Sequence, residues 1–109
     1  MSQYIIYFNQ QWVGVHSSEW FQSRGPLARA VVAEMKEAGV LLFAGGLVEE
    51  IERAIGITEH GEIRDRITSD GEFLGGLTII EAASDEEANK WGAKIGQACG
   101  WPQEVRKFK

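Results

Sequence analysis

Three apolar stretches of the chain have the length and composition of buried β-strands. Residues 3–8 (QYIIYF), 40–44 (VLLFA) and 77–81 (LTIIE) are rich in aliphatic and aromatic side chains, which favour strands. Apolar residues occupy both alternating positions of these runs, as is typical of strands covered on both faces. Residues 104–108 are expected to form a last strand. The pattern therefore predicts a sheet with two apolar faces.

Two further segments have the 3.6-residue period of amphipathic helices. The first, after a cap at Ser17 or Ser18, carries a stripe made of Leu27, Val31, Met35 and Ala38 and ends at Gly39, where a positive φ is expected. Gly25-Pro26 predicts a break or kink, because proline has no backbone N–H. The second helix is expected over residues 85–98, with a capping box between Ser84 and Glu87. Its core stripe is Ala88, Trp91, Ile95 and Ala98.

Residues 54–58 and 62–67 flank His60-Gly61 and predict a β-hairpin inserted before the third apolar strand. Without the hairpin, the element order is βαββαβ. This is the ferredoxin-like plan of a single α+β domain, here residues 1–109, with two helices on one face of an antiparallel sheet.

The other face of such a sheet would be apolar and uncovered. Exposed apolar patches of this size usually mark an interface, so we expect sheet-to-sheet packing of two chains in a homodimer. The alternative is a monomer in which the hairpin insert folds back over the open face.

The composition narrows the classes of partner. The chain has 109 residues, is 44% hydrophobic and carries a net charge of −5, which disfavours nucleic acids and anionic membranes as partners. Cys99 is the only cysteine, so no intramolecular disulfide can form. No signal peptide and no apolar run near 20 residues is visible, and we therefore expect a cytoplasmic protein without a membrane partner.

Few residues suggest chemistry. His16 lies in an aromatic loop and has a side chain suited to acid–base work. Glu49 belongs to an acidic cluster, and Asp70 precedes a glycine in a predicted turn, where its role is either structural or catalytic. Two histidines and one cysteine give no metal signature, and the glycine pairs lack phosphate-loop spacing, so we expect neither metal nor cofactor. Five arginines could each bind a small anion, although surface ion pairing is their commoner role: Arg24, Arg29, Arg64, Arg66 and Arg106.

Four ordered blocks of the sequence resemble the YCII-related proteins. They are AGVLL followed by GGL at residues 38–47, DGEF at 70–73, LGGLTIIEA at 74–82 and EVR at 104–106. The most similar branch is the one named for its Asp-Gly-Pro-Phe motif. The resemblance covers almost the whole chain and implies a dimeric α+β barrel of ferredoxin-like subunits. Some members of that branch occur with extracytoplasmic-function sigma factors, which suggests a regulator as a possible partner.

The sequence departs from the family pattern at two places. Glu72 replaces the proline of the motif, and Phe73 leads directly into Leu74. The better-known YCII branch resembles small enzymes with a His–Asp pair in the barrel cleft, and the corresponding positions here are Pro26 and a site near Glu49. Proline cannot act as a base, so at most half of that pair is present.

Two functions follow from these observations. The first is a small-molecule binding or interaction module built on a dimeric α+β barrel. The alternative is a cofactor-independent enzyme of the lyase or hydrolase type. It would use proton transfer, with Asp70 or Glu49 as the base and His16 as a partner.

Overall fold

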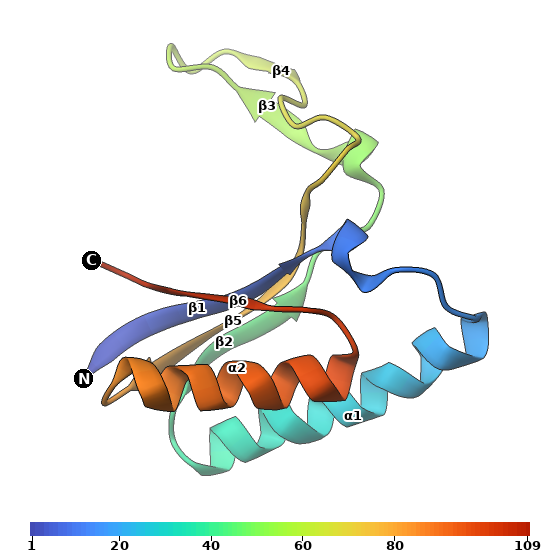
Figure 1. Cartoon of the computed structure of the whole chain (residues 1–109). Coiled ribbons are helices and arrows are strands. Elements are labelled where there is room, and N and C mark those ends of the chain that lie inside the picture. The colour runs from blue at the N-terminus through green and yellow to red at the C-terminus, as the bar shows by residue number, and fades with distance from the viewer.

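The computed structural model describes all 109 residues and consists of a four-stranded sheet, two helices beneath it and a projecting two-stranded arm (Figure 1). The main-sheet strands and helices are β1 (Ser2–Asn9), α1 (Ser18–Glu37), β2 (Leu41–Gly46), β5 (Leu74–Ala82), α2 (Asp85–Cys99) and β6 (Glu104–Lys107). The arm contains β3 (Ile55–Ile57) and β4 (Ile63–Asp65), and two short 3-10 helices are η1 (Gln10–Val13) and η2 (Ile51–Arg53).

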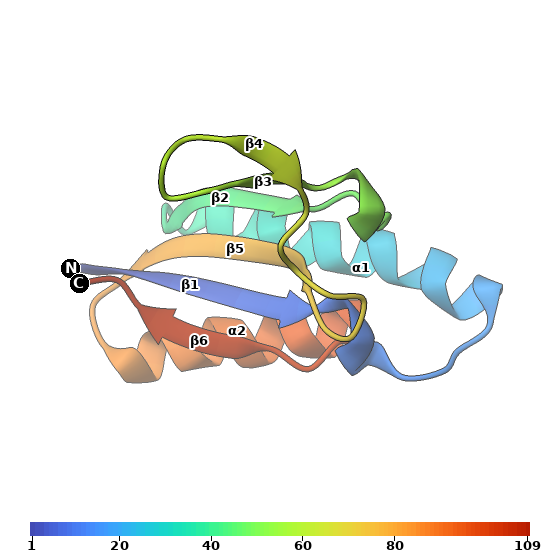
Figure 2. The ribbon, with the colours of Figure 1, turned by 90° about the horizontal axis from the view of Figure 1, so that it is seen from above.

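The four main strands are arranged in the order β2-β5-β1-β6, and every neighbouring pair is antiparallel. Both helices cover the same face of the sheet, as the two perpendicular views show (Figures 1 and 2). The predicted α+β class is therefore confirmed, and the architecture is compatible with a ferredoxin-like fold. Neither helix is long and apolar enough to cross a membrane.

The core lies between the sheet and the helices. Alternate residues of β1 point toward the helices, so Tyr4 and Ile6 are buried and pair with Ile80 and Thr78 of β5. Met35 of α1 fills the layer below them. The apolar stripe of α1 is shorter than the sequence predicts: Val31 and Met35 are buried, whereas the outer members of the stripe, Leu27 and Ala38, are exposed.

Helix α1 begins at the predicted cap, where the Ser17 hydroxyl accepts a hydrogen bond from the Trp20 amide (3.2 Å). The helix is not interrupted at Gly25-Pro26, so a break there is wrong. Proline removes one helical hydrogen bond at a cost of about 3 kcal/mol. Tertiary contacts on both sides of the proline offset this cost, because Trp20 packs against Trp101 and Val31 is buried in the core. Gly39 follows with the expected positive φ of 75°.

Helix α2 has the predicted N-terminal capping residues. The Ser84 hydroxyl accepts from the Glu87 amide at 3.2 Å, and the Glu87 carboxylate accepts from the Ala83 amide at 3.1 Å. The carboxylate thus reaches one residue further back than in the usual capping box. The helix ends at Gly100, whose φ of 79° is left-handed.

The predicted hairpin is confirmed, and Ile57 of β3 pairs with Ile63 of β4. We call residues 51–73 the arm. The arm forms a sheet of its own and stands away from the main sheet, on the side opposite the helices (Figure 1). It consequently leaves the open face of the main sheet uncovered. The radius of gyration is 15.3 Å, compared with about 13 Å for a compact domain of this length.

Candidate functional site

An open cleft of about 670 Å³ lies between α1 and the strands β2 and β5. Small residues form the two facing walls: Gly25, Ala28 and Ala33 on α1, and Ala44, Gly45 and Gly46 on β2. Because these side chains extend so little, helix and strand remain separated by empty space. The volume is in the range of sites that bind small molecules.

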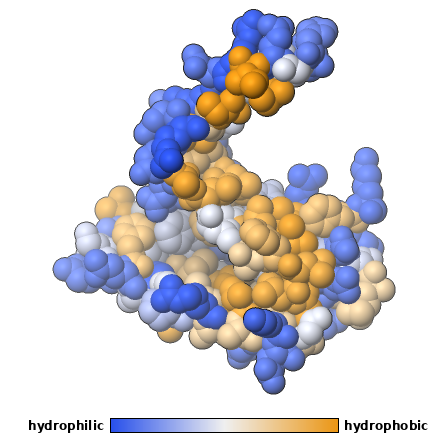
Figure 3. All heavy atoms as spheres, turned by 180° about the vertical axis from the view of Figure 1, so that it is seen from behind, coloured by the Kyte–Doolittle hydropathy of each residue, from blue (hydrophilic) through white to orange (hydrophobic).

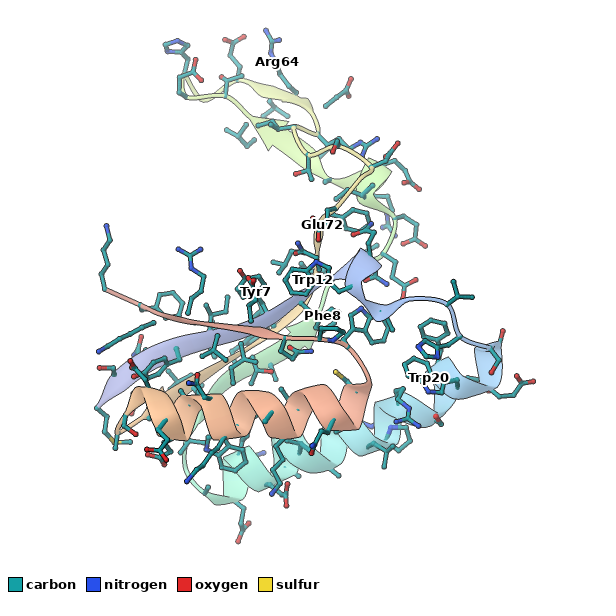
Figure 4. The ribbon with its side chains drawn as sticks, in the orientation of Figure 1. Tyr7, Phe8, Trp12, Trp20, Arg64 and Glu72 are labelled. Carbon is teal, nitrogen blue, oxygen red and sulfur yellow. The ribbon has the colours of Figure 1, made fainter.

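Aromatic side chains close one end of the cleft. The Phe8 and Trp101 rings are 5.1 Å apart, and Phe21 lies 5.6 Å from Trp101. Figure 4 shows Phe8 on the helix side of the sheet, whereas Tyr7 points toward the arm. The Phe8 ring lies so close to Gly76 that a Cβ there would be 2.8 Å from it. The absence of a side chain at Gly76 therefore lets the Phe8 ring lie against β5.

The cleft also has a polar lining that is mostly positive. Arg24, Arg29 and Lys36 of α1 border it, and Glu49 contributes the only carboxylate. Thr78 is the one buried polar residue of the chain, only 6% exposed, and it borders the same space. The cleft therefore combines apolar walls with a few polar groups, the usual composition of a ligand site.

Cys99 lies at the aromatic end, and burial raises the pKa of its thiol. The Gln103 amide Nε2 is 3.3 Å from the sulfur and 3.1 Å from the carbonyl oxygen of Trp101. A thiol with a raised pKa is protonated at neutral pH, and the thiolate is the nucleophilic form. Cys99 thus borders the cleft as a protonated thiol.

The three residues singled out from the sequence are not brought together. Glu49 borders the cleft from the loop after β2. The His16 ring stacks on Trp20 at a centroid distance of 3.5 Å, and its Nε2 donates to the Val13 carbonyl oxygen at 3.1 Å. Asp70 lies at the base of the arm, exposed and 2.5 Å from the Arg66 guanidinium. Neither His16 nor Asp70 borders the cleft.

The sequence does not show which of the arginines lie together, or which other polar residues line the cleft. The sequence pattern assigned no role to Lys36, Thr78 and Gln103, although all three border the space. A usable signal was the spacing of Gly25, Ala28 and Ala33, which puts small residues on one side of α1.

The open face of the main sheet is a second candidate site. Ile5, Tyr7 and Ile79 lie on it, and Phe43 of the edge strand, opposite Ile79, is 57% exposed. The Tyr7 hydroxyl donates to the Glu104 carboxylate at 2.5 Å, which raises the pKa of Tyr7. At the base of the arm, the Trp12 indole donates to Glu72, as Figure 4 shows for the two side chains.

No three ligating side chains cluster in a way that could hold a metal ion. No model of a known protein family matches the chain, and neither does any curated protein. The site must therefore be interpreted from its own chemistry.

Proposed function

We propose that the protein is a homodimeric module that binds a small molecule in the cleft beneath its sheet. The main support for this proposal is the cleft itself. It has apolar walls, an aromatic end and a few polar groups, and its volume is that of a small-molecule site. Glu49, near the position at which the resemblance to the YCII-related proteins implies an acid, borders the same cleft. A cytoplasmic setting, which the single cysteine favours, is part of the proposal.

The enzyme alternative has less support. Of its three candidate residues, Glu49 alone borders the cleft, and His16 is engaged with Trp20 and Val13. Proton transfer by two groups requires both within hydrogen-bond reach of one substrate. The alternative thus depends on Glu49 acting as a single base.

A thermal-shift screen of small-molecule mixtures tests the binding function, because a ligand of the native state raises the apparent stability. We expect at least one compound to raise Tm for the wild-type chain and for the control Ala30→Trp, which alters α1 outside the cleft. The variant Ala33→Trp places a large ring in the cleft and should abolish the shift. Equal shifts in both variants would contradict binding in the cleft.

The proposed dimer is formed through the open face of the sheet and the arm. Four isoleucines of the arm are more than half exposed, namely Ile55, Ile57, Ile63 and Ile67. Figure 3 shows hydrophobic side chains on the arm and on the body below it, with a hollow between them. Isolated apolar residues on a surface are normal, but contiguous sets of this kind mark an interface.

The amount of exposed surface favours a second copy as the partner. The chain exposes 7412 Å², compared with about 6,000 Å² for a monomer of this mass. The excess of about 1,400 Å² is within the roughly 1,000–2,500 Å² that each chain buries in an obligate homodimer. The open face carries a negative charge at Glu104 and a positive charge at Arg106. In a two-fold dimer, Glu104 of one chain can therefore pair with Arg106 of the other.

Sedimentation velocity at micromolar concentration tests this interface. We expect the wild-type chain to sediment with twice the mass of one chain. Ile79→Glu puts a charge in the middle of the open face and should produce a single-chain species, whereas Ala93→Glu, on the exposed surface of α2, should not. A single-chain species for the wild type would refute the dimer.

A further inference from the structure

The positive side chains of the cleft form a group that the rest of the protein does not neutralise. Arg24, Arg29 and Lys36 border the cleft along α1, and Glu49 is the only acid there. This sign is opposite to the net charge of −5 of the whole chain. The four Lys and Arg ion pairs of the protein use other cations, at Arg64, Arg66, Lys90 and Lys94.

Both arginines lie against neighbouring groups at the border of the cleft. The guanidinium of Arg24 lies 5.0 Å from the centre of the Trp20 ring, and its Nε is 3.2 Å from the Ser23 hydroxyl. The Arg29 guanidinium lies over Gly25, where a Cβ would come within 3.1 Å of Nη1. Arginine presents a planar fork of donors that matches carboxylate and phosphate oxygens. The stacking of Arg24 on Trp20 restricts that side chain, which reduces the ordering cost that binding an anion would require.

The remaining lining restricts the rest of the ligand. Val32, Ile95 and the aromatic end give apolar contact, and the Thr78 hydroxyl is the single buried polar group between them. Resting on the binding function proposed above, we infer that the ligand is a small organic oxyanion, a carboxylate or phosphate on an apolar or aromatic body. Its oxyanion meets the cations of α1, and its body fills the space between the small residues of α1 and β2.

Three probes of matched shape test this inference on the full chain by NMR titration of the labelled protein: phenylacetate, phenyl phosphate and the neutral phenylacetamide. We expect at least one anion to bind about tenfold or more tightly than the amide, as one charge-assisted hydrogen bond would produce. The tighter of the two anions identifies the head group.

Charge-removing variants inside and outside the cleft test whether the anion binds at the cations of α1. Arg29→Gln and Lys36→Gln should each weaken the anion about tenfold or more and leave the amide unchanged. Lys90→Gln removes the same charge from an exposed position of α2 outside the cleft and should change neither. An equal loss in all three variants would show a general charge effect and overturn the inference.

Other outcomes separate the two proposals. Equal binding of the anions and the amide, or no binding of any probe while the compound screen finds a neutral ligand, overturns the oxyanion and leaves the binding function standing. No probe bound and no shift in the screen refutes both.

Discussion

The close packing of Trp20 on Gly100 joins the start of α1 to the end of α2, and a single substitution tests its contribution to stability. Gly100 has a φ of 79°, and a Cβ there would lie 2.5 Å from the Trp20 ring and 3.3 Å from Cδ of Arg24. Gly100→Ala should therefore lower the free energy of unfolding through two effects. The left-handed backbone costs about 1–2 kcal/mol, and overpacking against the ring costs about 1–3 kcal/mol. We expect the free energy of unfolding to fall by about 2–5 kcal/mol in total.

Gly39→Ala is the matched control for the backbone contribution. Gly39 has a φ of 75° and follows α1, but nothing lies within 4 Å of its Cβ position. Its loss should be about 1–2 kcal/mol, from the backbone alone. Urea unfolding followed by far-UV circular dichroism, at one protein concentration, gives both values.

The double variant Trp20→Ala/Gly100→Ala separates packing from backbone strain. With the ring removed, the added methyl group at position 100 should cost no more than it does at Gly39. The reasoning is refuted if Gly100→Ala destabilises the protein no more than Gly39→Ala does, or if the penalty persists without the ring.

Three further predictions concern the caps and the titrating groups. Ser84→Ala should lower the free energy of unfolding by about 1 kcal/mol, because the Glu87 amide loses its acceptor, whereas Ser84→Asp should retain most of it; equal losses would contradict the capping role. The hydrogen bond to Asp85 raises the pKa of Tyr4 above 10.0, so the folded state holds this proton more tightly and stability falls as the pH rises above 10. Tyr4→Phe should make the fall of the urea midpoint between pH 9 and 11 less steep, and an unchanged slope would contradict the assignment. Alkylation of Cys99 should be slow at pH 8 in the native protein and fast in urea, because burial raises the thiol pKa; equal rates would show an accessible thiolate.

Much of the fold can be predicted from local patterns. The strands, both helix caps, the hairpin and the positive φ of Gly39 each depend on neighbours in the sequence, and the structure has them all. The continuity of α1 through Pro26 could not be predicted this way, because it depends on packing of Trp20 and Val31 against distant elements.

The candidate site was predicted less completely. Glu49 borders the cleft, but Asp70 and His16 lie elsewhere, engaged with Arg66 and Trp20. Asp70 lies in a turn and His16 in a loop, where no helix or strand period predicts the direction in which a side chain points. Only the course of the chain decides what they face.

The sequence by itself determined the elements, their order and the sheet with two apolar faces, because strand alternation and helix period are local properties of the chain. Only the tertiary structure decided where the cleft lies. Small residues of α1 and β2, distant in sequence, meet across a cleft, and the arm points away from the face it could have covered. Cavities and uncovered faces arise from the relative placement of whole elements, and long-range packing fixes that placement.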